Sequence, residues 1–387
     1  MTRLLLFKNS VLAVLFSLAV FNSNAQSIYY PDTAWQVKKP EELKMNAALL
    51  DSAVRMAIAS ENKMERDLRI ANMKAYAGEP DYKIIGPMKQ RGGPAGLVIK
   101  NGYIVAQWGD ISRVDMTFSA TKSYLSTMAG LAVDSGLIKS VTDKVDTYVW
   151  DGSFDGDHNS KVTWEHLLNQ SSDWSGTLFG LHDWADRPPK TGGIDDWKNR
   201  KLNEPGTVYE YNDVRVNLLA YSLLQVWRKP LPMLLKEKIM DPIGASTTWR
   251  WYGYDHSYVN IDGLMMQSVS GGGHHGGGIF INTYDQARFG LLFLRQGKWK
   301  NRQLISEKWV NAAHQSSPAE KKYGYMWWIN ATQSWKEVAP TIFYAVGFGG
   351  NYIIIDQEHD LMLVTRWIDD AKVGEVFSLI SKSAAVK

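Results

Sequence analysis

The chain has 387 residues, with 43 lysines and arginines against 40 aspartates and glutamates, 16 tryptophans and no cysteine. The lack of cysteine excludes disulfides, cysteine nucleophiles and thiolate metal sites. Because the charges nearly balance and no basic run stands out, we do not expect a nucleic acid partner.

The first 25 residues are typical of a secretory signal peptide. Two basic residues, Arg3 and Lys8, precede an apolar run over residues 10–21, and the small residue Ala25 offers a cleavage site. A membrane anchor is the alternative, but a span needs roughly 20 apolar residues. We therefore expect a bacterial protein exported to the periplasm or the medium, with no membrane span once the signal is removed.

The mature chain opens with a helix and a hairpin. A helix is predicted over residues 46–60, with an asparagine at its capping position. Residues 61–93 are polar and punctuated by glycine and proline, which indicates irregular structure. Two β-rich runs within residues 96–108 flank Asn101-Gly102, the strongest short hairpin signal.

A serine and a lysine mark the start of the next helix, which is predicted to end near residue 135. In Ser119-Ala120-Thr121-Lys122 the two side chains are three residues apart and share one helix face. A serine in the first turn also lies at the positive end of the helix dipole. An adjacent amine can activate such a serine as a nucleophile without a histidine.

The remaining elements predict an α+β fold. Residues 136–320 read as mostly helical with long loops, and the chain closes with strands and one more helix. Helices are expected near residues 163–169, 214–228, 285–296, 307–315 and 371–386, and strands near 323–329, 341–346, 351–356 and 361–367. The early hairpin and late strands should form one antiparallel sheet, flanked by the terminal helices, with an inserted, mostly helical lobe.

This order predicts one composite domain over residues 26–387. Its sheet lobe is expected to comprise residues 45–112 and 320–387, and its helical lobe residues 113–319. A cleft should lie between the two lobes, where the helix of Ser119 begins.

Two further segments could complete a serine site. Tyr211 follows a Pro-Gly turn and precedes a helix. An adjacent ammonium such as Lys122 would favour its phenolate and make it a base, whereas the alternative is an ordinary loop aromatic. The glycine-rich run 343–352 allows close backbone approach and could supply an oxyanion amide beside that of Ser119; the alternative is a hairpin turn without chemistry.

These segments, in this order, resemble the serine β-lactamase and penicillin-binding-protein superfamily, nearest its class C-like branch of esterases and amidases. The first motif is Ser119 to Lys122, the second is Tyr211-Asn212-Asp213, and the third falls on Ala345-Val346-Gly347. Residues 162–168 and 276–289 are also similar to segments of that family.

The resemblance implies a role for each of four residues. Ser119 would be the nucleophile that forms an acyl-enzyme, and Lys122 and Tyr211 would share the proton transfers. The backbone N–H groups of Ser119 and of Phe348, which follows Gly347, would form the oxyanion hole. The resemblance implies neither a metal nor a cofactor.

Two departures from the family pattern bear on the substrate. Asp213 replaces the usual asparagine, and its carboxylate should favour the charged form of Lys122. Ala345 replaces a lysine or histidine that helps to hold an anionic substrate. We therefore expect a small non-β-lactam ester or amide. The alternatives are a DD-peptidase or β-lactamase, and a non-catalytic protein that binds glycan or peptidoglycan fragments.

Histidines and tryptophans leave further alternatives open. His274-His275 could suggest a metal, but adjacent side chains on a strand point to opposite faces, so a flexible loop edging the cleft is favoured. His166 and His182 are interpreted as structural, although a Ser/His/Asp triad on Ser119 stays open. The tryptophans are expected to pack in core and loops, with an aromatic-lined cleft as the alternative. The oligomeric state is not indicated.

Overall fold

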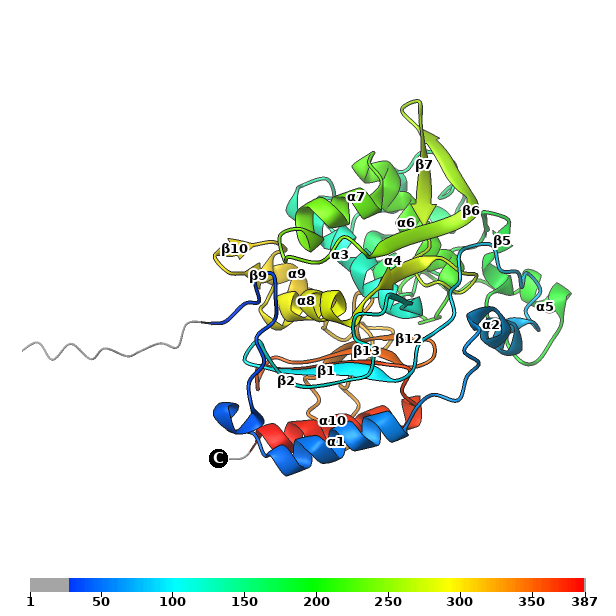
Figure 1. The fold of residues 1–387 in the computed structure, drawn as a ribbon. Coiled ribbons are helices and arrows are strands. Elements are labelled where there is room, and N and C mark those ends of the chain that lie inside the picture. Colours follow the sequence, from blue (N-terminus) through cyan, green and yellow to red (C-terminus); the bar gives the residue numbers. More distant parts are fainter. Residues whose placement is uncertain (1–27, 386–387) are drawn as a thin grey trace, which may run out of the picture.

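The computed structural model describes residues 28–385, so the predicted signal peptide lies outside the described residues. One six-stranded antiparallel sheet runs through the molecule (Figure 1). Its strands, in spatial order, are β11 (Trp328–Ile329), β12 (Phe343–Gly347), β13 (Asn351–Asp356), β14 (Leu361–Arg366), β1 (Ala95–Lys100) and β2 (Tyr103–Trp108). The prediction that the early hairpin and the late strands share one antiparallel sheet is confirmed.

The β1–β2 hairpin turns at the predicted dipeptide. Asn101 and Gly102 both have positive φ angles, 52° and 86°, as a tight two-residue hairpin turn requires. β1 then pairs along its whole length with β14, from Ala95 opposite Arg366 to Lys100 opposite Leu361. An early strand and a late strand of the chain are thus paired inside the sheet.

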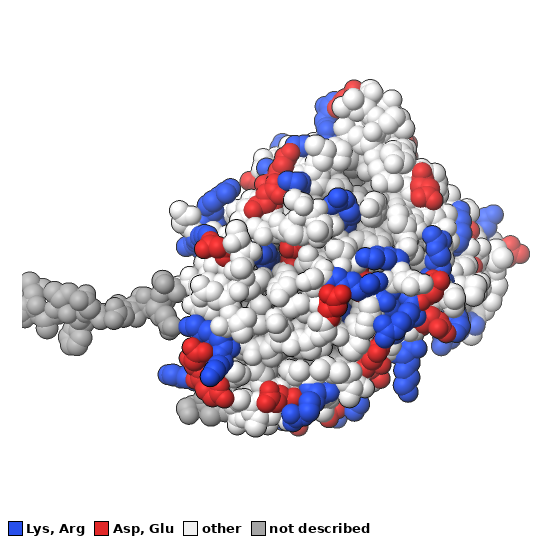
Figure 2. All heavy atoms as spheres, in the orientation of Figure 1, with Lys and Arg blue, Asp and Glu red and all other residues white. Residues whose placement is uncertain are grey.

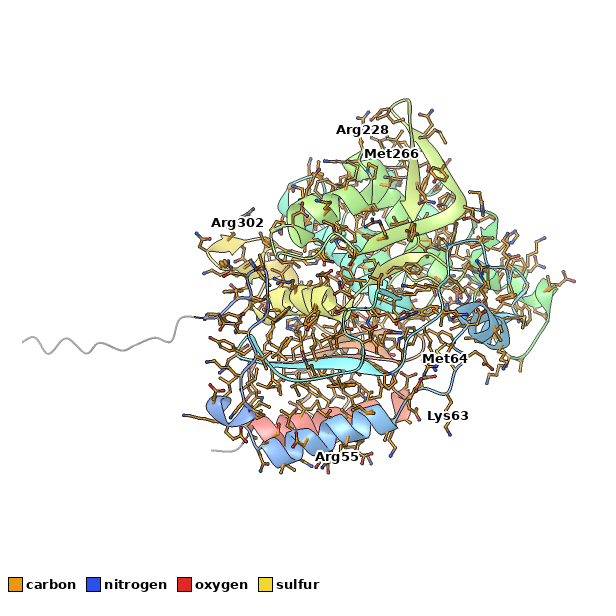
Figure 3. The ribbon with its side chains drawn as sticks, in the orientation of Figure 1. Arg55, Lys63, Met64, Arg228, Met266 and Arg302 are labelled. Atoms are coloured by element: carbon orange, nitrogen blue, oxygen red, sulfur yellow. The ribbon has the colours of Figure 1, made fainter. Side chains whose placement is uncertain are left out.

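Two helices from opposite ends of the chain cover one face of this sheet. They are α1 (Ala47–Ala59) and α10 (Asp370–Ala384), which lie side by side (Figure 1). Their inward residues, including Leu50, Ala53 and Phe377, form a separate apolar cluster with the sheet. Arg55 instead points outward from α1 (Figure 3).

The other face of the sheet carries the lobe that holds the serine. Helix α8 packs on β13 and β14, and the remaining helices lie beyond it (Figure 1). The helices of this lobe are α3 (Thr121–Asp134), α4 (Trp164–Leu168), α5 (Ile194–Lys198), α6 (Asp213–Trp227), α7 (Leu231–Leu235), α8 (Thr283–Leu294) and α9 (Glu307–Ala313). Helix α3 lies at its centre and is buried over most of its length. The helices predicted near 163–169, 214–228, 285–296 and 307–315 are confirmed.

The lobe also contains strands that the sequence analysis did not predict. β6 (Arg250–Ile261) and β7 (Leu264–Val269) form a hairpin that extends beyond the lobe (Figure 1). β8 (Gly278–Ile281) joins β6 to β3 (Asp115–Met116), and β4 (Thr177–Leu178), β5 (Leu181–His182), β9 (Lys298–Trp299) and β10 (Arg302–Gln303) make two short ribbons. The long hairpin has many exposed side chains on both strands, so it lacks the strict burial pattern of a core strand. Its turn at Asp262-Gly263 is a hairpin signal that was not used in the sequence analysis.

Two further predictions were wrong in detail. Residues 61–93 contain a helix, α2 (Leu68–Tyr76), capped by the side chain of Asp67. Its only fully buried positions are Leu68, Ala71 and Asn72, a stripe too narrow to stand out in a polar segment. Within 323–329 only β11 is a strand, because Met326 has a positive φ of 62° that interrupts extended backbone.

The surface agrees with the balanced composition. Basic and acidic side chains are interspersed over the face shown in Figure 2. Among residues 28–385, no helix combines the length and apolarity that crossing a bilayer requires.

We predict that Asn46→Ala destabilises the fold by about 1 kcal/mol without altering the site. Asn46 Oδ1 accepts a hydrogen bond from the Leu49 amide at 3.1 Å and so caps α1 on the face remote from Ser119. Urea unfolding should show the loss, while Asn46→Asp, which keeps the capping oxygen, should unfold close to the wild type. Equal loss in both variants would contradict the capping role.

Candidate functional site

The backbone around Ser119 is fixed from both sides. Phe118 adopts a left-handed φ of 49°, a strained conformation for a non-glycine residue. The Thr117 amide donates to the Ile279 carbonyl at 2.9 Å, and the Ile279 amide donates to Thr121 Oγ1 at 3.0 Å. Strand β8 therefore holds the turn that leads into α3. Ser119 lies on this turn and is half-buried.

Lys122 lies between the serine and a carboxylate. Its Nζ donates to Ser119 Oγ at 3.0 Å and to Asp213 Oδ1 at 2.6 Å. The Lys122 and Asp213 side chains are only 2% and 1% exposed. The structure thus brings together the serine and lysine of the first motif with the aspartate of the second.

Both members of this pair are ionised. Burial alone would lower the pKa of Lys122, but the Asp213 carboxylate and Tyr211 together outweigh it, and the pKa lies above the usual lysine value. Burial alone would raise the pKa of Asp213, but Lys122 and Arg187 hold it far below the usual range. The lysine is therefore an ammonium that donates to Ser119.

Tyr211 reaches the same place by a local mechanism. The Asn212 side chain caps α6 by accepting from the Arg215 amide at 3.1 Å, which puts Tyr211 and Asp213 on either side of the cap. The Lys122 ammonium lies 4.5 Å from the centroid of the Tyr211 ring. Within residues 28–385, no hydrogen bond holds the Tyr211 hydroxyl, so the ring, and not the oxygen, contacts the lysine.

The third motif packs directly against the serine turn. A Cβ on Gly347, at the end of β12, would lie 1.8 Å from the Thr117 carbonyl oxygen and 3.1 Å from the Ala120 amide nitrogen. Only glycine fits there. The next residue, Phe348, has its ring 5.3 Å from that of Phe118. In the described part of the chain, the Ser119 and Phe348 amides donate in none of the turn, loop or cap hydrogen bonds.

A glycine also seals the ion pair. A Cβ on Gly272 would lie 1.7 Å from Asp213 Oδ1 and 2.2 Å from Lys122 Nζ. The glycine-rich segment 270–278 therefore covers the charged pair directly. His274 and His275 in this segment are 4% and 3% exposed, which corrects the expectation of a loop at the edge of the cleft.

Arg187 is a site residue that the sequence analysis missed. Its Nη2 lies 2.7 Å from Asp213 Oδ2 and 2.9 Å from His274 Nδ1, and its Nη1 lies 2.5 Å from Asp186 Oδ1. His274 Nε2 in turn lies 2.6 Å from Glu79 Oε2. The charged pair of residues 186 and 187 just before Pro-Pro was the available signal, but nothing in the sequence joined it to the motifs.

A second tyrosine borders the cluster. Tyr76, at the end of α2, lies 5.5 Å from the Phe348 ring and 4.2 Å from the His274 ring. Burial raises the pKa of Tyr76 to about 12, so it is a neutral phenol at pH 7. It forms part of the wall of the site.

One group of side chains has metal-ligand chemistry. Ligand atoms of Glu79, Asp186 and His274 lie within 4.8 Å of one another. The Arg187 guanidinium contacts both Asp186 and His274, however, and supplies positive charge at that place. Burial lowers the pKa of the neighbouring His275 to about 4, so that ring is neutral. The contacts of this group fit an ion-pair network better than a metal centre.

The other histidines singled out from the sequence bond elsewhere. His166 Nδ1 accepts from the Thr163 amide in the N-terminal cap of α4, and His182 Nδ1 lies 2.8 Å from Asp81 Oδ2. The structure brings neither to Ser119.

The tryptophans mainly pack in the core, as expected. Seven are buried in the main apolar cluster: Trp164, Trp174, Trp249, Trp251, Trp299, Trp309 and Trp327. Trp328 is the exception that matters for the site, because its ring lies 6.1 Å from that of Tyr211.

Comparisons with known proteins identify the family and the fold. The beta-lactamase family model matches residues 83–366. A search of functionally curated proteins finds no match. Similar solved structures include EstCE1, a hydrolase with promiscuous acyltransferase activity (14% identity, 90% of this chain and 99% of that one, TM-score 0.58). A family VIII carboxylesterase (16%, 87% and 98%, 0.55) and a penicillin-binding protein homologue from Caulobacter crescentus (16%, 76% and 91%, 0.54) share the fold. The chain belongs to the beta-lactamase family and has the β-lactamase/transpeptidase-like fold.

Proposed function

We propose that the protein is an exported serine hydrolase that cleaves a small ester or amide through an acyl-enzyme on Ser119. The observation that carries this proposal is the 3.0 Å hydrogen bond from the Lys122 ammonium to Ser119 Oγ. It places a cation at the oxygen that would attack the substrate, at the start of a buried helix. The esterase and hydrolase names of two structural neighbours support the reaction class.

The charge state of Lys122 assigns the proton transfers. Since Lys122 already carries its proton, we assign to it the orientation of Ser119 and the stabilisation of the developing alkoxide. Tyr211 is then the group left to accept the Ser119 proton and to return it to the leaving group. The cations of Lys122 and Arg187 lie 4.5 and 5.3 Å from its ring centroid, so Tyr211 borders the charged groups beside Ser119.

The oxyanion would be held by backbone. The carbonyl oxygen of the substrate becomes negatively charged when Ser119 Oγ attacks, and two fixed amides are suited to hold it. We assign this role to the N–H groups of Ser119 and Phe348, because Gly347 allows strand β12 to approach the serine turn within contact distance.

The third motif favours an uncharged substrate. Ala345 is 1% exposed and belongs to the main apolar core, so this position offers no cation to a substrate carboxylate. The nearby Arg187 guanidinium is already paired with Asp186 and Asp213. A neutral ester or amide therefore suits the site better than a β-lactam, whose carboxylate needs a free cation.

Ser119→Ala should reduce hydrolysis of nitrophenyl acetate by roughly 10⁴-fold or more, because the acyl-enzyme can no longer form. Steady-state kinetics and mass detection of the acyl adduct are the measurements. Ser126→Ala is the matched control, since Ser126 also lies on α3 and its buried hydroxyl has no hydrogen-bond partner within the described structure.

Undiminished turnover in Ser119→Ala would sink the proposal. Stable labelling of Ser119 by a fluorescent penicillin would instead favour a DD-peptidase or β-lactamase. A wild-type protein that neither hydrolyses esters nor reacts with a fluorophosphonate would indicate a binding protein.

Asp213→Asn should destabilise the fold by about 3–5 kcal/mol at pH 7, because it leaves the Lys122 charge buried without its partner. Since folding lowers the pKa of Asp213, its contribution is complete above the usual aspartate value of about 4 and is lost as the pH falls below it. The difference between the wild type and the variant should therefore shrink between pH 7 and pH 3.5.

Urea unfolding at both pH values is the measurement. Asp262→Asn serves as the control, because Asp262 pairs with Arg228 at the surface and exposed pairs contribute about 1 kcal/mol or less. Equal effects of the two substitutions would show that burial of the Lys122–Asp213 pair is unimportant to stability.

A further inference from the structure

Arg187 occupies a central place in the site, although no family motif contains it. It follows the short helical turn Asp183–Ala185 and adopts a left-handed φ of 50°. Its side chain is 28% exposed, and its guanidinium lies 5.3 Å from the Tyr211 ring centroid and 5.6 Å from that of Tyr76. The guanidinium is thus placed between two tyrosine rings, one of which belongs to the proposed catalytic group.

The same guanidinium completes the coordination of Asp213. The two carboxylate oxygens are divided between two cations: Oδ1 lies 2.6 Å from Lys122 Nζ and Oδ2 lies 2.7 Å from Arg187 Nη2. Within the described structure, Oδ2 has no partner with hydrogen-bond geometry, so its contact with Arg187 is purely ionic. Without Arg187, Oδ2 would be a buried charge with nothing opposite it.

The far side of Arg187 is held by a network of its own. Arginine can only donate, so His274 Nδ1 must accept from Arg187 Nη2, which puts the ring proton on Nε2. That Nε2–H then donates to Glu79 Oε2 at 2.6 Å. Asp186 completes the network: its Oδ1 faces Arg187 Nη1, and its Oδ2 accepts from the Asp213 amide.

We propose that Arg187 is a positioning residue for the reaction at Ser119. It fixes the Asp213 carboxylate and the Tyr211 ring so that Lys122 keeps its hydrogen bond to the serine. This inference rests on the hydrolase function proposed above. Arg187 acts through its neighbours, because its guanidinium is committed to Asp186, Asp213 and His274 and is not free to bind a substrate anion.

Loss of Arg187 has two physical consequences. The Asp213 carboxylate is released on one side and can turn fully toward Lys122, which draws the ammonium away from Ser119. The site also loses one positive charge. The pKa of an acidic group close to that charge then rises, because its deprotonated form is less stabilised. Lys122 faces Asp213, Tyr211, Arg187 and Ser119. Arg187 faces Asp186, Asp213, Tyr76, Tyr211 and His274, with Glu79 behind that histidine.

The test compares Arg187→Gln and Arg187→Lys with the wild type on nitrophenyl acetate. We expect kcat to fall by on the order of 10²-fold in Arg187→Gln, as for an active site misplaced by about 1 Å, with a much smaller change in KM. Arg187→Lys should recover part of the rate, because it restores one charge but cannot bridge Asp186 and Asp213 together. The acidic limb of the kcat/KM profile should move to higher pH in Arg187→Gln.

Arg200→Gln is the matched control. Arg200 is similarly buried, at 22% exposure, and its Nη2 pairs with two carboxylates, Asp173 at 2.7 Å and Asp183 at 3.0 Å, but it does not touch Lys122, Tyr211 or Asp213. We expect this variant to keep the wild-type kcat and pH profile. A loss in Arg200→Gln equal to that in Arg187→Gln would reduce Arg187 to a structural role and overturn the inference.

The remaining outcomes are distinguishable. Wild-type kcat and an unshifted pH profile in Arg187→Gln, with Ser119→Ala inactive, would overturn this inference alone. Activity retained in Ser119→Ala would overturn the hydrolase function and this inference with it. If Arg187→Gln does not fold, Arg187→Lys carries the test, and an unchanged rate and profile in that variant would be equally decisive against the inference.

Discussion

The buried ion pair between Lys122 and Asp213 is the interaction on which the rest of the site depends. Charges this far from water are tolerated only when each has a close partner, and here the two lie 2.6 Å apart. Because Lys122 belongs to the first turn of α3 and Asp213 begins α6, the pair also fixes the relative position of the two helices that carry the first and second motifs. The geometry of Ser119 is therefore coupled, through Lys122, to the ionisation of a residue 91 positions from that lysine.

Closely packed backbone segments surround the ion pair and the serine turn. Gly272 brings a backbone segment over it where any side chain would collide, and Gly347 does the same for the strand beside the serine. The strained φ of Phe118 is maintained because β8 clamps the residues on both sides of it. The backbone at Gly272 thus packs against the ion pair, while Gly347 and β8 hold the serine turn.

Local signals in the sequence were enough to predict several helices, the first hairpin and the serine–lysine pair. The asparagine cap at residue 46, the Asn101-Gly102 turn and the spacing of Ser119 and Lys122 each depend on only a few neighbouring residues, and each occurs as predicted. Arg187, Glu79 and His274 could not be found this way, because their roles arise from contacts between segments about 90 to 200 residues apart. The β6–β7 hairpin was missed for another reason: many of its side chains near the turn are exposed, and its one clear signal is that turn.

The departures at Ala345 and Asp213 become intelligible when they are considered together. An asparagine at position 213 would leave Lys122 without a charged partner on that residue, and a cation at position 345 would be a further positive charge beside Lys122 and Arg187. Here Asp213 supplies a negative charge that Lys122 and Arg187 share, and Asp186 balances the second cation. Lys122 and Arg187 are thus each paired with a carboxylate of the same cluster, and the third motif adds no further cation. The alanine at position 345 is thus consistent with the aspartate at 213, and together they describe a site whose charges are satisfied internally before any substrate arrives.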